Sequence, residues 1–176
     1  EEQLTGNVAV GSGELQSSSF LTQLLTAFQE KNPLVSFTIY SGNSDNIKER
    51  IERGLLDVGL LQEPVDISKY SFVRTPCREQ WGVLVREDSE LASRERVSPA
   101  DLASVPLILP EREIVQNELL NWFGPYAEGL RITATGNLLY NLASLARASG
   151  GSVLTLNLDC TYEGLRFIPL SPPLES

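Results

Sequence analysis

Apolar residues occur along the chain at two different spacings. Short runs such as NVAVG and VSFTIY are rich in β-branched residues and predict strands. Between these runs Phe20, Leu24 and Phe28 recur four positions apart, so we expect a helix over residues 17–31 that turns this stripe toward a core. A short helix over residues 47–53 follows. The run LLDVGLL after it is typical of a strand buried on both faces of a parallel sheet. The first part of the chain is therefore predicted to be β-α-β-α-β.

The alternation begins again after about residue 70. A helix is expected from Ser98, which is a good N-cap residue, with Pro99 in the first helical position. Two longer helices are expected over residues 113–123 and 137–148, the second with Asn137 as its cap and its leucines facing inward. The predicted strands of this part are FVRTP, WGVLVRED, VPLIL, LRITAT, SVLTL and LRFIPL.

The repeated pattern indicates the fold class and the division of the chain. Strands alternating with helices predict an α/β protein made of two αβ lobes, with a ligand cleft between them. We expect residues 1–65 to form the first lobe and residues 66–157 the second. Residues 158–176 are expected to return toward the first lobe.

The charge of the chain limits its partners. The formal net charge is −9 and the arginines are scattered without a run. This chain should therefore not itself bind DNA or an acidic membrane. There is no apolar stretch long enough to cross a bilayer, which predicts a soluble, cytoplasmic protein or a mature fragment. Because methionine is absent altogether, the chain is expected to be part of a longer one.

The complete absence of histidine argues against catalysis. It removes the commonest general base and the commonest metal ligand at once, so we expect no enzyme, no metal and no cofactor. Cys77 and Cys160 stand far apart and are predicted to be unpaired thiols. The stretch GSGELQSSS lacks the Gly-Lys-Ser/Thr ending of a phosphate loop and the third glycine of a dinucleotide fingerprint. A serine nucleophile there would have no base beside it.

Four turns remain as candidates for ligand binding. GSGELQSSS, SGNSDN, LPEREI and TGN each follow a predicted strand and precede a predicted helix. Such a turn can present backbone N–H groups and the positive end of a helix dipole to a ligand. Ordinary helix capping would explain each turn alone. Because all four lie at the carboxyl ends of strands, we favour a common binding cleft.

Successive segments of the chain resemble the effector-binding domain of LysR-type transcriptional regulators. The segments are LTGNVAVGSGE, AFQEKNP, the run from VSFTIY to LLDVGLL, WGVLVREDSELA, VSPADLASVPLIL and NLLYNLASLARASGG. The resemblance implies two αβ lobes of the type II periplasmic-binding-protein kind with a small-molecule inducer between them. It places the inducer contacts at Glu14, Leu15, Gln16, Ser17, Asn43, Ser44, Gln62, Pro110, Glu111, Arg112, Gly136, Asn137 and Leu138.

The resemblance also implies partners. A homodimer or tetramer is expected, with Leu21, Leu25 and Ala143 as exposed apolar contacts, unless these residues only complete the core. DNA would be bound by an N-terminal winged helix-turn-helix domain that this chain does not contain. Helix N-termini favour a carboxylate, whereas nearby glutamates disfavour several negative charges, so the inducer is expected to be small, polar and at most singly anionic. The alternative is a solute-binding protein of a transporter, which has the same fold.

Overall fold

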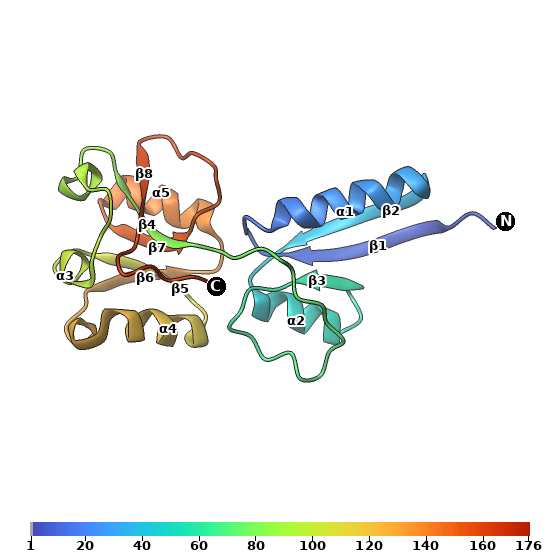
Figure 1. Ribbon diagram of the computed structural model, residues 1–176, viewed down its shortest axis with the longest axis horizontal. Coiled ribbons are helices and arrows are strands. Elements are labelled where there is room, and N and C mark those ends of the chain that lie inside the picture. The colour runs from blue at the N-terminus through green and yellow to red at the C-terminus, as the bar shows by residue number, and fades with distance from the viewer. Residues whose placement is uncertain (1) are drawn as a thin grey trace. The chain divides into compact units, whose positions relative to one another are not determined.

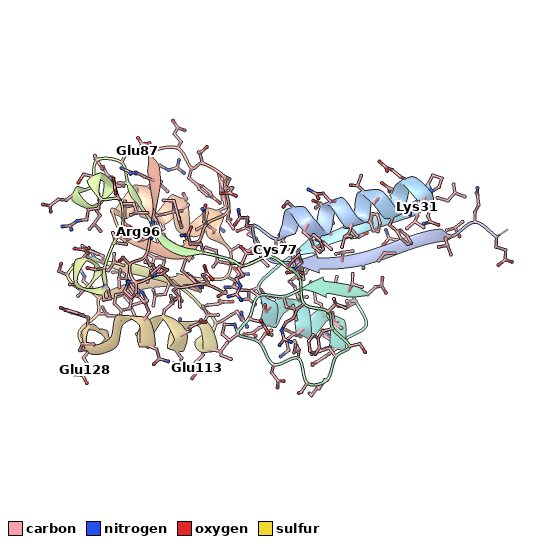
Figure 2. The ribbon with its side chains drawn as sticks, viewed as in Figure 1. Lys31, Cys77, Glu87, Arg96, Glu113 and Glu128 are labelled. Atoms are coloured by element: carbon pink, nitrogen blue, oxygen red, sulfur yellow. The ribbon has the colours of Figure 1, made fainter. Side chains whose placement is uncertain are left out.

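The chain forms two compact units in the computed structural model, which describes residues 2–176. The first unit ends at Cys77 and the second runs from Arg78 to Ser176 (Figures 1 and 2). Both contain parallel strands with helices between them, as the sequence predicts. The boundary lies about a dozen residues later than expected, because the segment after the third strand stays with the first unit.

The first unit is a three-stranded parallel sheet with a helix on each face. The strand order is β2-β1-β3, with β1 in the centre. α1 packs against β2, whereas α2 packs against β1 and β3 on the opposite face (Figure 1). The elements are β1 (Thr5–Ser12), α1 (Ser18–Lys31), β2 (Leu34–Ser41), α2 (Ser44–Glu52) and β3 (Val58–Leu60).

Two glycines allow α2 to approach the sheet closely. A Cβ on Gly11 would lie 3.0 Å from Ile47 Cγ2, and one on Gly59 would lie 2.5 Å from the same atom. Ile47 is completely buried, and with Val10 and the other buried apolar residues it forms the small core of this unit. The helix that carries SGNSDN at its start is thus held against the centre of the sheet.

The prediction for LLDVGLL was wrong in extent and in burial. β3 has only three residues, and Leu55 and Val58 are exposed. The reason is the strand order: β3 pairs with β1 alone, so it is an edge strand of this unit. A continuous apolar run is typical of a strand that is covered on both faces, and β3, at the edge of the sheet, is covered less completely.

The apolar stripe of α1 is formed as predicted but is not buried. Leu24 is 53% exposed and Phe28 is 43% exposed, while Leu21 and Leu25 are half-buried. The ring of Phe28 still reaches Phe37 of β2, with 6.5 Å between the ring centroids. Within the first unit, α1 therefore presents apolar surface that the unit itself leaves uncovered.

The second unit is a five-stranded mixed sheet in the order β6-β5-β7-β4-β8. β5 runs parallel to β6 and β7, whereas β4 runs antiparallel to β7 and β8. The elements are β4 (Trp81–Arg86), η1 (Glu90–Ser93), α3 (Pro99–Leu102), β5 (Leu107–Pro110), α4 (Glu113–Phe123), η2 (Gly124–Ala127), β6 (Ile132–Gly136), α5 (Leu139–Ser149), β7 (Ser152–Leu156) and β8 (Leu165–Pro169).

Several helix boundaries of this unit follow their local signals. The Ser98 side chain accepts a hydrogen bond from the N–H of Asp101, and Pro99 begins α3. The carboxylate of Asp101 in turn accepts the N–H of Ser98, which lowers the pKa of Asp101. The helix predicted over residues 113–123 coincides with α4. Both predictions are confirmed, and the start of α3 could be predicted because a capping side chain acts on N–H groups only a few residues away.

The last helix begins later than predicted and buries a different face. Leu138, not Asn137, is the N-cap residue, and α5 starts at Leu139. Its buried residues include Ala143, which is 0% exposed, whereas Leu145 is exposed. The prediction of Ala143 as an exposed dimer contact was therefore wrong. Ala143 belongs to the apolar core cluster of the second unit, where a small residue lets α5 pack closely.

Two further predictions for the second unit fail. FVRTP forms no strand and belongs to the irregular end of the first unit. The chain also does not return to the first unit after residue 157 within the described residues. β8 pairs with β4 instead, and the N–H of Trp81 donates to the Leu174 carbonyl at 2.9 Å. These backbone hydrogen bonds keep the final segment in the second unit.

Candidate functional site

The carboxyl ends of the three strands of the first unit meet at one edge of its sheet. In the strand register, Ser12 of β1 lies beside Ser41 of β2 and Leu60 of β3. The N–H of Gly42 donates to the Ser12 carbonyl at 3.2 Å, which joins the ends of two strands. The turns GSGELQSSS and SGNSDN therefore lie side by side, as the sequence predicts for parallel strands.

Hydroxyl groups fix the shape of the turn between β1 and α1. Ser12 Oγ donates to the Gly13 carbonyl at 2.8 Å and lies 3.1 Å from Ser18 Oγ. Ser18 Oγ also lies 3.0 Å from the Gly13 carbonyl and accepts the N–H of Leu15 at 3.3 Å. Ser12 and Ser18 thus hold the turn in shape through hydroxyl groups that lie just before and just after it.

The predicted contact residues of this turn differ in exposure. Ser17 is buried and is the N-cap residue of α1, although its side chain makes no capping hydrogen bond. Glu14 and Leu15 are half-buried, and Gln16 is exposed. The structure therefore brings these four residues to the edge of the sheet with different access to solvent.

The second turn joins Asn43 and Ser44 to the end of β3. Asn43 and Asn46 form a capping box, in which the N–H of each donates to the side-chain oxygen of the other at 2.9 Å. Ser44 Oγ accepts the N–H of Gln62 at 2.9 Å and lies 3.2 Å from the Gln62 carbonyl. The predicted residues Asn43, Ser44 and Gln62 thus belong to one connected group.

A corresponding edge is present in the second unit. Pro110 of β5 lies beside Gly136 of β6, and the N–H of Glu111 donates to the Gly136 carbonyl at 2.9 Å. Gln116 Nε2 donates to the Pro110 carbonyl at 2.7 Å and ties α4 to the same strand end. Arg112 is the N-cap residue of α4 and is only 5% exposed. A buried guanidinium is rare in folded proteins, and no local pattern in the sequence indicates that Arg112 is buried.

The remaining predicted residues lie beside Gly136. A Cβ on Gly136 would come within 2.7 Å of Leu142 Cδ2, so the strand end packs tightly under α5. Asn137 is exposed and Leu138 is half-buried. The structure therefore brings Pro110, Glu111, Arg112, Gly136, Asn137 and Leu138 to one edge of the second sheet.

Several titratable groups lie outside these edges. Burial raises the pKa of Glu118 in α4. A hydrogen bond to the Glu52 carboxylate raises the pKa of Tyr70 to about 12. Cys77 and Cys160 are exposed free thiols. Among the described residues, no group of three or more acidic or cysteine side chains is arranged to hold a metal ion. Within residues 2–176, no helix has the length and apolar character needed to cross a membrane.

The sequence family follows from comparison with known proteins. A family model described as the LysR substrate binding domain matches residues 1–175. The chain belongs to this family, and its two αβ units are those of a type II periplasmic-binding-protein-like fold. The resemblance inferred from the sequence segments is confirmed.

Three individual proteins illustrate the similarity. The regulator YvbU of Bacillus subtilis is 26% identical over 104 residues, which are 59% of this chain and 35% of YvbU. The HTH-type transcriptional regulator TtuA of Agrobacterium vitis is 24% identical over 166 residues, 92% of this chain and 55% of TtuA. The chain thus spans about half or less of these relatives. The effector binding domain of QuiR, solved with shikimate, superimposes with a TM-score of 0.78 at 14% identity, covering 95% of this chain and 81% of that domain.

Proposed function

We propose that this chain is the effector-binding part of a LysR-type transcriptional regulator and that it binds a small molecule at the two strand-end edges. The observation that carries the proposal is the gathering of predicted contact residues at the carboxyl ends of parallel strands in both units. Family membership supports the same function, and the matched family does not favour a transporter's solute-binding protein. In the full regulator, a ligand that prefers one arrangement of the units would shift its population.

The buried guanidinium of Arg112 favours an effector with one anionic group. Two of its nitrogen atoms, Nε and Nη1, are buried and make no hydrogen bond to any described residue, and the helix that starts at Arg112 adds its positive N-terminal end. Glu14 and Glu111 near the turns disfavour a second negative charge. A monocarboxylate is therefore the proposed class, and shikimate, the ligand of QuiR, is one compound to test.

A thermal-shift titration tests this function. The compounds are shikimate, benzoate, glutamate and citrate, each added to the wild type, to Arg112→Gln and to Arg131→Gln. Arg131 is an exposed arginine of the same unit and serves as the matched control. A monocarboxylate at 100 times its dissociation constant should stabilise the wild type by about 2.7 kcal/mol, and Arg112→Gln should lose most of this. Equal stabilisation of both variants, or none with any compound, would contradict the proposal.

We further propose that the chain contributes to a homodimer or tetramer through α1. Leu24 and Phe28 leave an apolar face on this helix, with Leu21 and Leu25 half-buried beside them. On α5 the exposed apolar side chains are Tyr140 and Leu145, which replace Ala143 as candidates for the partner's contact surface. A dimer would remove these side chains from water.

Sedimentation velocity at roughly ten micromolar tests the dimer, because assembly depends on protomer concentration. Leu24→Glu should shift the chain toward monomer. Val73→Glu is the control, since Val73 is 93% exposed and lies outside α1. A wild type that is monomeric at this concentration, or equal effects of the two substitutions, would count against the α1 interface.

The proposal assigns DNA binding to a helix-turn-helix domain of the full protein that lies outside this chain. The relatives are HTH-type regulators, and a chain of net charge −9 repels a polyanion. On this proposal the chain is not an enzyme and acts in the cytoplasm, where bacterial DNA is found.

A further inference from the structure

The turn between β1 and α1 is not held by an ordinary helix cap. Ser17 is the N-cap residue of α1, but its backbone has the right-handed helical conformation and its side chain makes no capping hydrogen bond. The hydroxyl of the next residue, Ser18, lies against the turn instead. It accepts the N–H of Leu15 at 3.3 Å and donates to the Gly13 carbonyl at 3.0 Å. Contacts other than capping therefore fix the shape of this turn.

Two hydroxyl groups bind the same carbonyl oxygen. Ser12 Oγ donates to the Gly13 carbonyl at 2.8 Å and Ser18 Oγ at 3.0 Å, and the two hydroxyl oxygens are 3.1 Å apart. A carbonyl oxygen has two lone pairs, so this pair of serines satisfies it completely. Ser12 is only 7% exposed, which protects its hydrogen bond from competing water.

The position of this carbonyl sets the direction of the next N–H group. The peptide bond between Gly13 and Glu14 is trans, and in a planar trans peptide the C=O and N–H groups point in opposite directions. Since both serines hold the Gly13 carbonyl, the N–H of Glu14 points away from them. The main-chain carbonyl of Ser12 also accepts the N–H of Gly42 at 3.2 Å. Ser12 therefore contributes to both turns at the edge of the first sheet.

We propose that Ser12 and Ser18 form a hydroxyl clamp that positions the first turn for the effector without contacting the effector themselves. This inference rests on the proposed effector-binding function. A turn whose peptides are already oriented binds more tightly than one that binding itself must order. The hydroxyl protons of both serines are used within the turn, so their effect on the effector acts through the Gly13–Glu14 peptide.

A double-mutant cycle tests the hydroxyl clamp. The variants are Ser12→Ala, Ser18→Ala and the double variant, and Ser71→Ala changes an exposed serine of the same unit as the matched control. Affinity for shikimate, benzoate, glutamate and citrate is measured by isothermal titration calorimetry under conditions in which urea unfolding shows every variant to be folded. Hydrogen exchange of the Leu15 amide, followed by NMR, reports on the turn without any ligand.

Each single variant should bind the carboxylate less than about threefold more weakly than the wild type, because the remaining hydroxyl still holds the Gly13 carbonyl. The double variant should lose about tenfold, and Ser71→Ala should lose nothing. Exchange of the Leu15 amide should become faster in Ser18→Ala but not in Ser12→Ala, since only Ser18 accepts this N–H. Ser18→Thr keeps the hydroxyl, so combined with Ser12→Ala it should bind as Ser12→Ala alone does.

Three results would overturn the inference and leave the proposed function in place. They are an unchanged affinity in the double variant, strictly additive losses from the two single variants, and unchanged exchange of the Leu15 amide in Ser18→Ala. A double variant that is less stable but binds as the wild type does would give the serines a structural role only. Failure of the wild type to bind any of the four carboxylates would overturn both this inference and the proposed carboxylate effector.

Discussion

Gly59 lies in β3 directly against α2, and its replacement by alanine tests how closely this helix packs on the sheet. A Cβ at this position would lie 2.5 Å from Ile47 Cγ2 and 3.1 Å from Ile51 Cδ1. Ile47 is completely buried, so its side chain cannot swing into open space. Either α2 moves away from the strand or Ile47 leaves its preferred rotamer.

The expected loss of stability follows from two opposing effects. Adding a methyl group to a filled core costs about 1–3 kcal/mol. Replacing glycine by alanine restricts the unfolded chain and thereby stabilises the folded protein by about 0.4–1 kcal/mol. The net loss for Gly59→Ala is therefore roughly 0.5–2 kcal/mol. With a urea m-value of about 1 kcal/mol/M for a unit of this size, the midpoint should fall by roughly 0.5–2 M.

Gly13 provides the matched control. A Cβ there would have its nearest neighbours at 3.4 to 3.7 Å, which is ordinary contact. Gly13→Ala should therefore unfold at the same urea concentration as the wild type or slightly higher. Urea unfolding followed by far-ultraviolet circular dichroism compares the three proteins. Equal midpoints for Gly59→Ala and Gly13→Ala would refute the close packing of α2 on β3.

Three further predictions concern caps and ionisable groups. Asn43→Ala breaks the capping box of α2 and should lower stability by about 1 kcal/mol in urea unfolding; no change would exclude this role. Tyr70 should ionise near pH 12 in an absorbance titration and return to about 10 in Glu52→Gln. Because its pKa is raised in the folded state, the stabilisation is present below about pH 10 and is lost toward pH 12; simultaneous ionisation of all tyrosines would contradict this. Glu118→Gln should gain stability at pH 7 relative to the wild type, because burial raises the pKa of Glu118, and the gain should vanish below about pH 4. A gain that does not depend on pH would have another cause.

The amino-acid sequence alone determined the features that act over short distances. Ser98 with Pro99 marks the start of α3, because a capping side chain reaches only the next few N–H groups. The start of α2 lies three residues before the predicted one, where Asn43 and Asn46 form the capping box. The helix predicted over residues 113–123 also has the limits of α4, although its N-cap residue, Arg112, makes no capping hydrogen bond with its side chain. The order of such elements also identified the family, since the segments of the resemblance keep their sequence along the chain.

The tertiary structure decided which apolar and polar groups are covered. LLDVGLL has the composition of a central strand, yet β3 lies at an edge, and only the pairing of strands fixes that position. Ala143 and Leu145 are two positions apart on α5 and therefore lie on nearly opposite faces of the helix, and only the face with Ala143 is packed against the core. The link between Ser44 and Gln62 joins residues 18 positions apart, and no local pattern in the sequence specifies it. Burial and long-range hydrogen bonds depend on neighbours that only the folded chain brings together.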